Sequence, residues 1–246
     1  MKAIIVTGFG INADVELAEA FRLSGVEPES VHAADLASEP KRLAGADFLG
    51  FPGGFSFGDH LGSAVVLANL VRKRLGSEIR AFVADGGMAI GICNGFQTLV
   101  KSGLLPDLGG TGEPEVTLVH NTCGHYLDTW VPVRFEAESR CVWTKGLSPR
   151  MLPIRHGEGR FVAKDDATLA RVESLGLVAL RYDGENPNGS ANDIAGICDL
   201  SGRVLGLMPH PEAFLKPDTH PYRRRGSVGG LGLDIFRHAV AWKESN

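Results

Sequence analysis

The stretch MAIGICNGFQTLVKSG, residues 88–103, decides the fold, because it joins a buried strand to a helix through a sharp turn. Residues 88–92 are a short, mostly apolar run, which is typical of a strand covered on both faces. Apolar residues then recur at helical spacing from Phe96 to Val100, and Gly103 suits the position that follows a helix C-terminus. The sequence therefore predicts a strand, a turn and a helix in direct succession.

Cys93 stands at this turn. Gly91 and Gly95 flank it two positions away on each side, where a tight strand-to-helix turn needs residues without a β-carbon. A thiol placed there meets the helix N-terminus, where free N–H groups and the helix dipole favour the thiolate. A single cysteine is more often a buried structural residue, but ordinary core packing does not require the two glycines. Cys93 is therefore the candidate nucleophile.

The composition is that of an ordinary globular protein, with 246 residues, 43% hydrophobic and 22% charged. No composition break, linker or internal repeat divides the chain, so we expect a single domain over residues 1–246. The net charge of −4 argues against a nucleic-acid-binding surface. The one dense basic run, residues 223–225, is interpreted as a solvated loop, with contact to a phosphate or an acidic partner as the alternative.

Cysteine spacing and hydropathy exclude further classes. The four cysteines show no C-x-x-C spacing, so no metal site is expected. A chain of this length does not need a disulfide framework. The N-terminal apolar run is too short for a signal peptide, and no stretch approaches membrane-spanning length. We therefore expect a cytoplasmic protein with neither a membrane nor a nucleic acid as its partner.

Strands and helices alternate in the first half of the chain. Expected strands cover residues 3–6, 30–34 and 46–51, and expected helices cover residues 14–21, 59–71 and 78–84. Asn12 or Asp14 would cap the first helix. The second helix would have Leu61, Val65 and Ala68 on its inner face. This alternation implies an open, mostly parallel twisted sheet with helices on both faces. Ligands bind beyond the carboxyl ends of such strands, where Cys93 lies.

The second half, after Pro106, is strand-rich. Expected strands cover residues 115–120, 127–135, 140–144, 177–182, 193–198 and 204–208, with a helix near residues 168–175. Asn188–Gly189 and Ser201–Gly202 are strong turn signals.

The stretch around residues 52–58 admits two interpretations. GFSFG at residues 54–58 matches a serine nucleophile elbow in its letters, but it does not follow a strand directly, so Ser56 is a weak candidate. A loop of backbone donors fits better, because glycines let main-chain N–H groups approach a ligand closely. Gly53 or Gly54, together with the N–H of Asn94 after the nucleophile, would form an oxyanion hole. A plain turn is the alternative.

Pro209-His210-Pro211-Glu212 follows the apolar run at residues 204–208. Each proline restrains the residue before it to extended geometry, where positions i and i+2 face the same way. Glu212 can then orient the His210 ring and stabilise its positive charge. Cys93, His210 and Glu212 form a plausible thiol–imidazole–carboxylate triad.

Five motifs extend across nearly the whole chain. They are FPGGFSFGDH at residues 51–60, GICNGFQT at 91–98, HGEGRFV at 156–162, NPNGSA at 186–191 and LGLMPHPEA at 205–213. Together they resemble the class I (triad-type) glutamine amidotransferases, and within these the glutaminase subunits of purine biosynthesis. The resemblance implies a flavodoxin-like fold and hydrolysis of glutamine through a γ-glutamyl thioester on Cys93.

The resemblance also implies further roles. Gln97, Thr122 and Tyr126 would contact glutamine. His156 and Glu158 are interpreted as part of a loop that couples the active site to a partner, with a second acid–base pair as the alternative. Ammonia would pass to a large synthetase subunit that consumes ATP with Mg²⁺ and formylglycinamide ribonucleotide, and a small third subunit would bridge the two. This chain itself would need no cofactor.

Two other functions stay open on the sequence. The first is a cysteine hydrolase or peptidase of the same fold. The second is a dinucleotide-binding regulatory module, because Gly8-x-Gly10-x-x-Ala13 follows the first strand and Asp35 ends the second. Short glycine motifs recur by chance, which weakens this second alternative.

Overall fold

The computed structural model describes residues 1–221 and 230–246, and the basic run at 223–225 lies outside them. The strands are β1 (Lys2–Thr7), β2 (Glu27–His32), β3 (Phe48–Phe51), β4 (Met88–Ile92), β5 (Val116–Val119), β6 (Leu127–Phe135), β7 (Arg150–His156), β8 (Arg160–Ala163), β9 (Val178–Tyr182), β10 (Ile194–Cys198) and β11 (Val204–Leu207). The α-helices are α1 (Asp14–Leu23), α2 (Ala33–Ser38), α3 (Val65–Arg74), α4 (Gly76–Ala84), α5 (Asn94–Lys101), α6 (Asp166–Ser174) and α7 (Leu233–Glu244).

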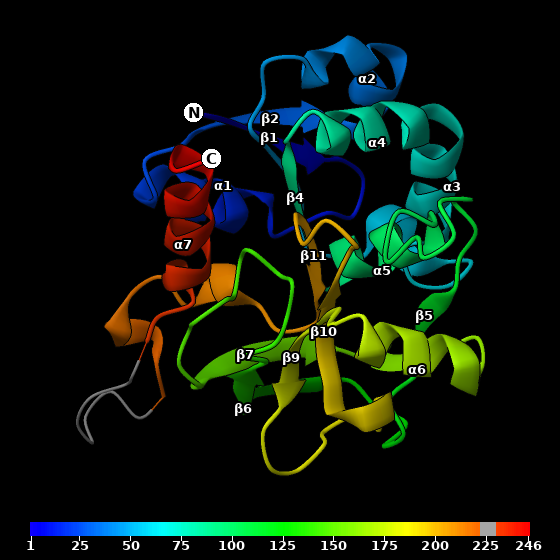
Figure 1. Cartoon of the computed structure of the whole chain (residues 1–246), viewed down its shortest axis with the longest axis vertical. Coiled ribbons are helices and arrows are strands. Elements are labelled where there is room, and N and C mark those ends of the chain that lie inside the picture. Colours follow the sequence, from blue (N-terminus) through cyan, green and yellow to red (C-terminus); the bar gives the residue numbers. More distant parts are fainter. Residues whose placement is uncertain (222–229) are drawn as a thin grey trace.

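Within the described residues, one nine-stranded sheet runs in the order β2-β1-β3-β4-β11-β10-β9-β6-β7 (Figure 1). The first five strands in this order are parallel, and the other four continue the sheet in antiparallel pairs. The remaining two strands, β5 and β8, pair separately. The sheet is therefore mixed but mostly parallel where the predicted nucleophile lies, as in the flavodoxin-like folds.

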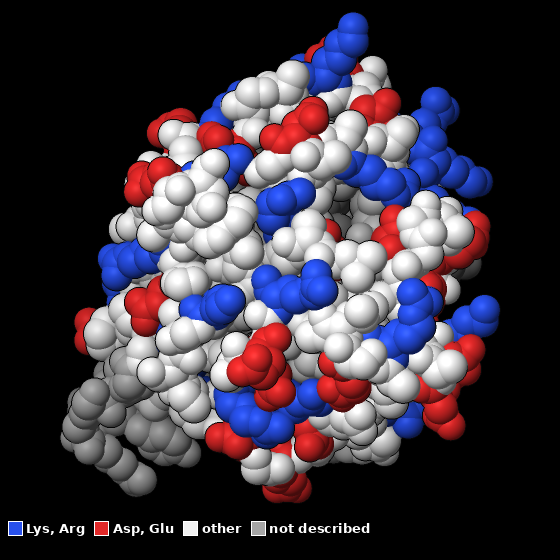
Figure 2. Space-filling model, in the orientation of Figure 1, with Lys and Arg blue, Asp and Glu red and all other residues white. Residues whose placement is uncertain are grey.

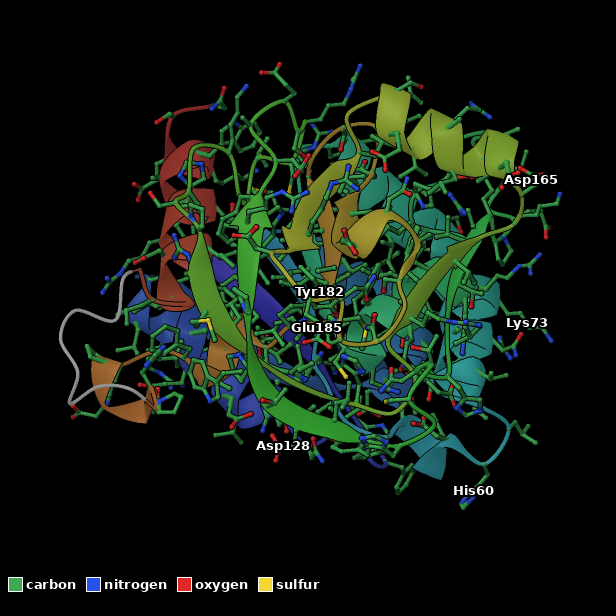
Figure 3. All side chains as sticks on the ribbon, turned by 90° about the horizontal axis from the view of Figure 1, so that it is seen from below. His60, Lys73, Asp128, Asp165, Tyr182 and Glu185 are labelled. Atoms are coloured by element: carbon green, nitrogen blue, oxygen red, sulfur yellow. The ribbon has the colours of Figure 1, made fainter. Side chains whose placement is uncertain are left out.

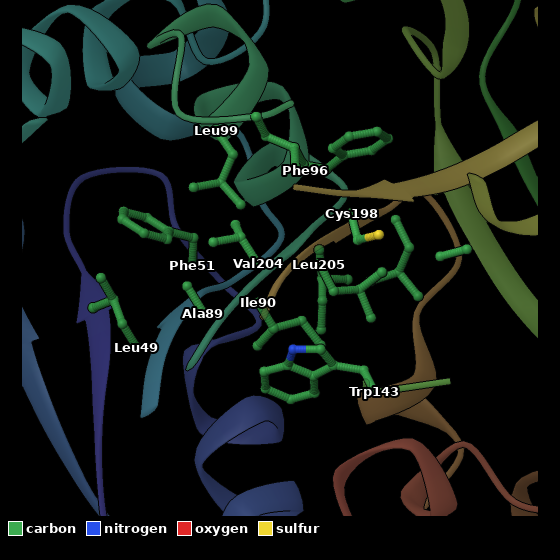
Figure 4. Close-up of a cluster of buried hydrophobic side chains, with 14 of the residues drawn as sticks. Leu49, Phe51, Ala89, Ile90, Phe96, Leu99, Trp143, Cys198, Val204 and Leu205 are labelled. Atoms are coloured by element: carbon green, nitrogen blue, oxygen red, sulfur yellow. The ribbon is translucent and has the colours of Figure 1, made fainter. Parts of the chain in front are cut away.

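Helices cover both faces of the parallel part. Helices α1 and α7 pack together on one face, and α3, α4 and α5 lie on the other (Figure 1). Strand β4, in the middle, is buried along its whole length. Phe96 and Leu99 of α5 pack on one side of it, whereas Ile90 points to the other side with Trp143 (Figure 4). This double cover explains the continuous apolar run in the sequence.

The two glycines beside Cys93 are needed because backbones meet there. A β-carbon on Gly95 would lie 1.9 Å from the carbonyl oxygen of Phe51, and one on Gly91 would lie 2.6 Å from the carbonyl oxygen of Gly95. Both distances are impossible for real atoms. The predicted strand, turn and helix over residues 88–101 are confirmed, and Gly103 follows the helix with a φ of 72°.

Several predicted boundaries are wrong. Helix α3 begins at Val65 instead of Asp59, because Asp59 and Ala64 adopt positive φ angles of 51° and 60°. The side chain of Asp59 accepts a hydrogen bond from the Ala64 N–H at 3.1 Å, which closes a turn in place of the helix. Leu61 consequently lies on the surface, 74% exposed, and not on an inner helix face.

Other differences concern caps and strands. Neither Asn12 nor Asp14 caps α1, since Ala13 holds that position without a side-chain bond. The second strand lies earlier than predicted and ends at His32, whose ring caps α2. Residues 140–144 form turns, and Trp143 reaches the core from there. The strands β7 and β8 and the helices α2 and α7 were not predicted.

The surface carries both signs of charge. On the face shown in Figure 2, lysine and arginine side chains are interspersed with aspartate and glutamate. This arrangement differs from the basic stripe that nucleic-acid binding requires. Within residues 1–221 and 230–246, the helices all fall short of the length and apolar character needed to cross a membrane.

Candidate active site

Three neighbouring parallel strands end at the same edge of the sheet, and each is followed by a predicted site residue. Strand β3 leads into Gly53, β4 into Cys93 and β11 into His210. The register pairs Phe51 with Gly91 and Leu207 with Ile92, so the strand ends are level. A cleft of about 70 Å³ opens there. The residues that line it are Asn12, Gly54, Phe55, Cys93, Tyr126, Arg155 and His210.

Cys93 occupies a strained elbow. Its φ and ψ are 52° and −105°, outside the regions that a residue with a β-carbon normally adopts. A backbone bond from the Cys93 N–H to the Leu207 carbonyl at 2.8 Å anchors the turn. The thiol, 6% exposed, points into the cleft and donates to the carbonyl of Arg155 at 3.5 Å. The elbow thus presents the sulfur at the start of α5.

His210 and Glu212 form a buried pair. Nδ1 of His210 lies 2.6 Å from Oε1 of Glu212, and the two residues are 3% and 1% exposed. Because a carboxylate only accepts, Nδ1 carries the proton and Nε2 is left for Cys93. Burial works to lower the pKa of His210, but the charge of Glu212, its hydrogen bond to the ring and the neighbouring Cys93 outweigh burial and raise this pKa to about 10.

The route by which Glu212 reaches His210 differs from the prediction. Residues Pro211–Ala213 form a short 3-10 turn, so Glu212 curls back instead of sharing a face of an extended segment. The His210 N–H donates to the Pro153 carbonyl of β7 at 2.8 Å, which fixes the start of this turn. The predicted contact is confirmed, and the predicted extended geometry is wrong.

The loop after β3 packs directly against the triad. A β-carbon on Gly53 would lie 2.8 Å from Cε1 of His210 and 3.6 Å from the β-carbon of Cys93. Gly54 lines the cleft with a φ of 143°, which residues with side chains rarely adopt. Ser56 is 2% exposed and does not line the cleft, so it is no longer a nucleophile candidate.

Asn94 and Gln97 of α5 form hydrogen bonds with the loop after β3 and with the loop that follows β7. The amide oxygen of Asn94 accepts from the Ser56 N–H at 3.2 Å, and its nitrogen donates to Asp59 and to Gln97. Gln97 in turn donates to the backbone carbonyl of Glu158 at 2.6 Å. The first turn of α5 therefore connects the glycine loop to the loop that contains the HGEGRFV motif.

Of the three residues predicted to contact glutamine, one lines the cleft and two do not. Tyr126 lines the cleft, 47% exposed, with its ring 6.3 Å from that of Phe55. Gln97 is buried and bonded as described, and Thr122 packs against Gly189, so neither lines this cleft. The sequence reasoning missed Asn12, Phe55 and Arg155. Phe55 lies inside a quoted motif and Arg155 directly precedes one, but the sequence carries no signal that brings either to Cys93.

His156 lies next to the site but outside the cleft. Asn121 donates through its side-chain nitrogen to the carbonyls of His125 and His156, so its oxygen is the acceptor for Nδ1 of His156 at 3.1 Å. Burial and the nearby charge of His210 lower the pKa of His156 to about 4. The ring is therefore neutral near pH 7 and supports the loop. Glu158 contributes its backbone carbonyl to Gln97.

The glycine motif at residues 8–13 packs against the loop that follows β3. A β-carbon on Gly10 would lie 2.0 Å from the Phe55 carbonyl oxygen. The N–H groups of Asn12 and Ala13, at the start of α1, both donate to the Gly53 carbonyl at 3.3 Å. A dinucleotide phosphate would need these amides. Because they already hold the loop, the dinucleotide-binding interpretation loses its structural basis.

Over residues 1–221 and 230–246, no group of three or more His, Cys, Asp or Glu side chains is arranged to hold a metal ion. The chemistry that the cleft supports is nucleophilic attack by a thiol with an imidazole as proton acceptor.

Known proteins share both sequence and fold with this chain. The model of the CobB/CobQ-like glutamine amidotransferase domain matches residues 1–243. The phosphoribosylformylglycinamidine synthase subunit PurQ of Dehalococcoides mccartyi is 41% identical, with 98% of this chain and 97% of the relative covered. The subunit of the same name from Methanococcus maripaludis strain C5 is 40% identical, with 100% and 94% covered.

Solved structures share the fold of this chain. A chain in the structure of PurLQS from Thermotoga maritima superposes with a TM-score of 0.76 and 30% identity, covering 98% of both chains. A glutamine amidotransferase from the same organism has a TM-score of 0.60 at 12% identity, covering 100% of this chain and 99% of that one, and so supports the fold alone.

Proposed function

The chain belongs to the family of CobB/CobQ-like glutamine amidotransferase domains, and on this premise we propose that it is the glutaminase subunit of a phosphoribosylformylglycinamidine synthase. It hydrolyses glutamine to glutamate and ammonia for purine biosynthesis. The observation that carries this proposal is the meeting of Cys93 with the buried His210–Glu212 pair in one cleft. Relatives about 40% identical over the whole chain bear the name of this subunit.

The geometry supports a sequence of four steps. The raised pKa of His210 favours a thiolate–imidazolium pair, in which the Cys93 thiol has given its proton to Nε2 of His210. The sulfur attacks the side-chain amide carbon of glutamine, and backbone N–H groups of Gly53 or Gly54 and of Asn94 stabilise the oxyanion. His210 returns the proton to the departing ammonia, which leaves a γ-glutamyl thioester. Water activated by His210 then releases glutamate and regenerates the thiol.

The partners follow from the same premise. The similar Thermotoga maritima chain comes from a structure of PurLQS. We assign the ammonia acceptor to a large synthetase subunit that uses ATP and Mg²⁺, with a small third subunit bridging the two. In this proposal the chain needs no cofactor of its own and acts in the cytoplasm.

The experiment compares two nitrogen sources in the assembled enzyme. Cys93→Ala removes the nucleophile, so we expect loss of glutamine-dependent synthesis while synthesis with added ammonium survives. Cys123→Ala, which changes an exposed cysteine outside the cleft, is the matched control and keeps both activities. If glutamine is not hydrolysed by the wild-type assembly, a hydrolase or peptidase of the same fold becomes the better account.

A further inference from the structure

Arg155 places a positive charge in the cleft. It is the penultimate residue of β7, and its side chain, 34% exposed, lines the cleft together with Cys93 and His210. Its own carbonyl accepts the hydrogen bond from the Cys93 thiol. Among the described residues that line the cleft, it carries the one permanent charge. None of the four proposed steps uses this guanidinium.

The present contacts of the guanidinium are weak. Its Nη2 lies 3.4 Å from Oε2 of Glu16, whose side chain is 44% exposed, so solvent screens that pair. Oε1 of Glu212 is 4.0 Å away and already bonded to His210 at 2.6 Å. Nη2 also lies 3.4 Å from Nδ1 of His210, but both atoms are donors, so this approach is not a hydrogen bond. A planar fork of N–H donors is thus available to a ligand.

We propose that Arg155 binds the α-carboxylate of glutamine and thereby selects the free amino acid over other amides, an inference that rests on the proposed function. An extended glutamine places its α-carboxylate carbon about 5 Å from its amide carbon. Arg155 lines the same small cleft as the sulfur that attacks this amide carbon. A guanidinium matches a carboxylate in charge and in planar, bidentate geometry.

The test uses a substrate without the group in question. 4-Aminobutanamide is glutamine without its α-carboxylate, and it keeps the amide that is hydrolysed. Ammonia release by the assembled enzyme gives kcat/KM for both compounds, and their ratio measures selection by the carboxylate. We expect R155M and R155Q each to lower this ratio by about 10- to 100-fold. R155K, which keeps the charge without the fork, gives a smaller loss.

A control variant on the surface and two contradicting outcomes complete the test. Arg22, in the last turn of α1 and 58% exposed, offers the matched variant R22M, which keeps the wild-type ratio. If R155M and R155Q reduce kcat for both compounds and leave the ratio unchanged, Arg155 only orients His210, and the inference is overturned. If the wild-type assembly hydrolyses no glutamine, the proposed function fails and takes this inference with it.

Discussion

The carboxylate of Glu212 lies 2.6 Å from Nδ1 of His210, and both side chains are buried. Buried charges are costly unless they are paired. Here the pair is held by backbone: the His210 N–H bonds to the Pro153 carbonyl, and Glu212 sits in the turn that follows. The imidazole is thereby held with Nδ1 donating to Glu212, which leaves Nε2 for the proton exchanged with Cys93.

Glu212→Gln tests this relationship. The glutamine side chain keeps the shape but removes the charge that raises the pKa of His210, whereas burial, which lowers it, remains. We expect glutamine-dependent turnover to fall by about 10²- to 10⁴-fold. The pKa of His210, followed by imidazole NMR, should decrease. Glu19→Gln, on the exposed side of α1, is the control. Turnover at the wild-type level in E212Q would remove Glu212 from the mechanism.

Gly53→Ala tests the contact between the glycine loop and the imidazole. The added β-carbon would lie 2.8 Å from Cε1 of His210, so the ring or the loop has to shift. We expect kcat for glutamine to fall by at least about tenfold, because small displacements at a reacting centre are costly. Gly109→Ala is the matched control, since its nearest neighbour would lie at 3.5 Å. Equal kcat in the two variants would mean that His210 tolerates the displacement.

His156 gives the fold a pH dependence. Its folded-state pKa of about 4 lies below the ordinary 6.5, so between these values the unfolded chain binds the extra proton. The neutral ring contributes at most about 3 kcal/mol above pH 6.5, and this contribution is lost as the pH falls through 4.

Urea unfolding at pH 7, 6, 5 and 4 measures this dependence. We expect the free energy of unfolding to decrease toward pH 4 less steeply in His156→Asn than in the wild type, because asparagine can still donate to Asn121 and does not titrate. His60→Asn is the control, since His60 points away from the molecule at its edge (Figure 3). Parallel pH profiles for the wild type and H156N would show that burial does not hold the ring neutral.

The elbow and the triad could be predicted from the sequence because their signals are local. Glycines around Cys93 indicate a turn that crowds its neighbours, and a carboxylate two residues after His210 indicates an imidazole–carboxylate pair, although the backbone there is a 3-10 turn and not extended. The same reasoning misplaced the start of α3. Hydrophobic spacing suggested a helix from Asp59, but it carries no information on the positive φ angles at Asp59 and Ala64 that delay it.

The surroundings of the triad depend on long-range packing. Strand β7 was not predicted because Pro153 interrupts its pattern, and a proline is tolerated there because β7 is an edge strand. Without β7, nothing in the sequence brings Arg155 to Cys93. Likewise, the glycine motif at residues 8–13 resembled a phosphate loop, and only the structure shows Gly10 packed against Phe55.

The most direct test of the central claim is peptide mass spectrometry after treatment of the assembled enzyme with an electrophilic glutamine analogue. Cys123 is the exposed thiol and Cys93 is only 6% exposed, so simple accessibility favours Cys123. The account predicts modification of Cys93, prevented by excess glutamine and absent in His210→Ala. Modification confined to Cys123, or labelling of Cys93 that glutamine does not prevent, would contradict it.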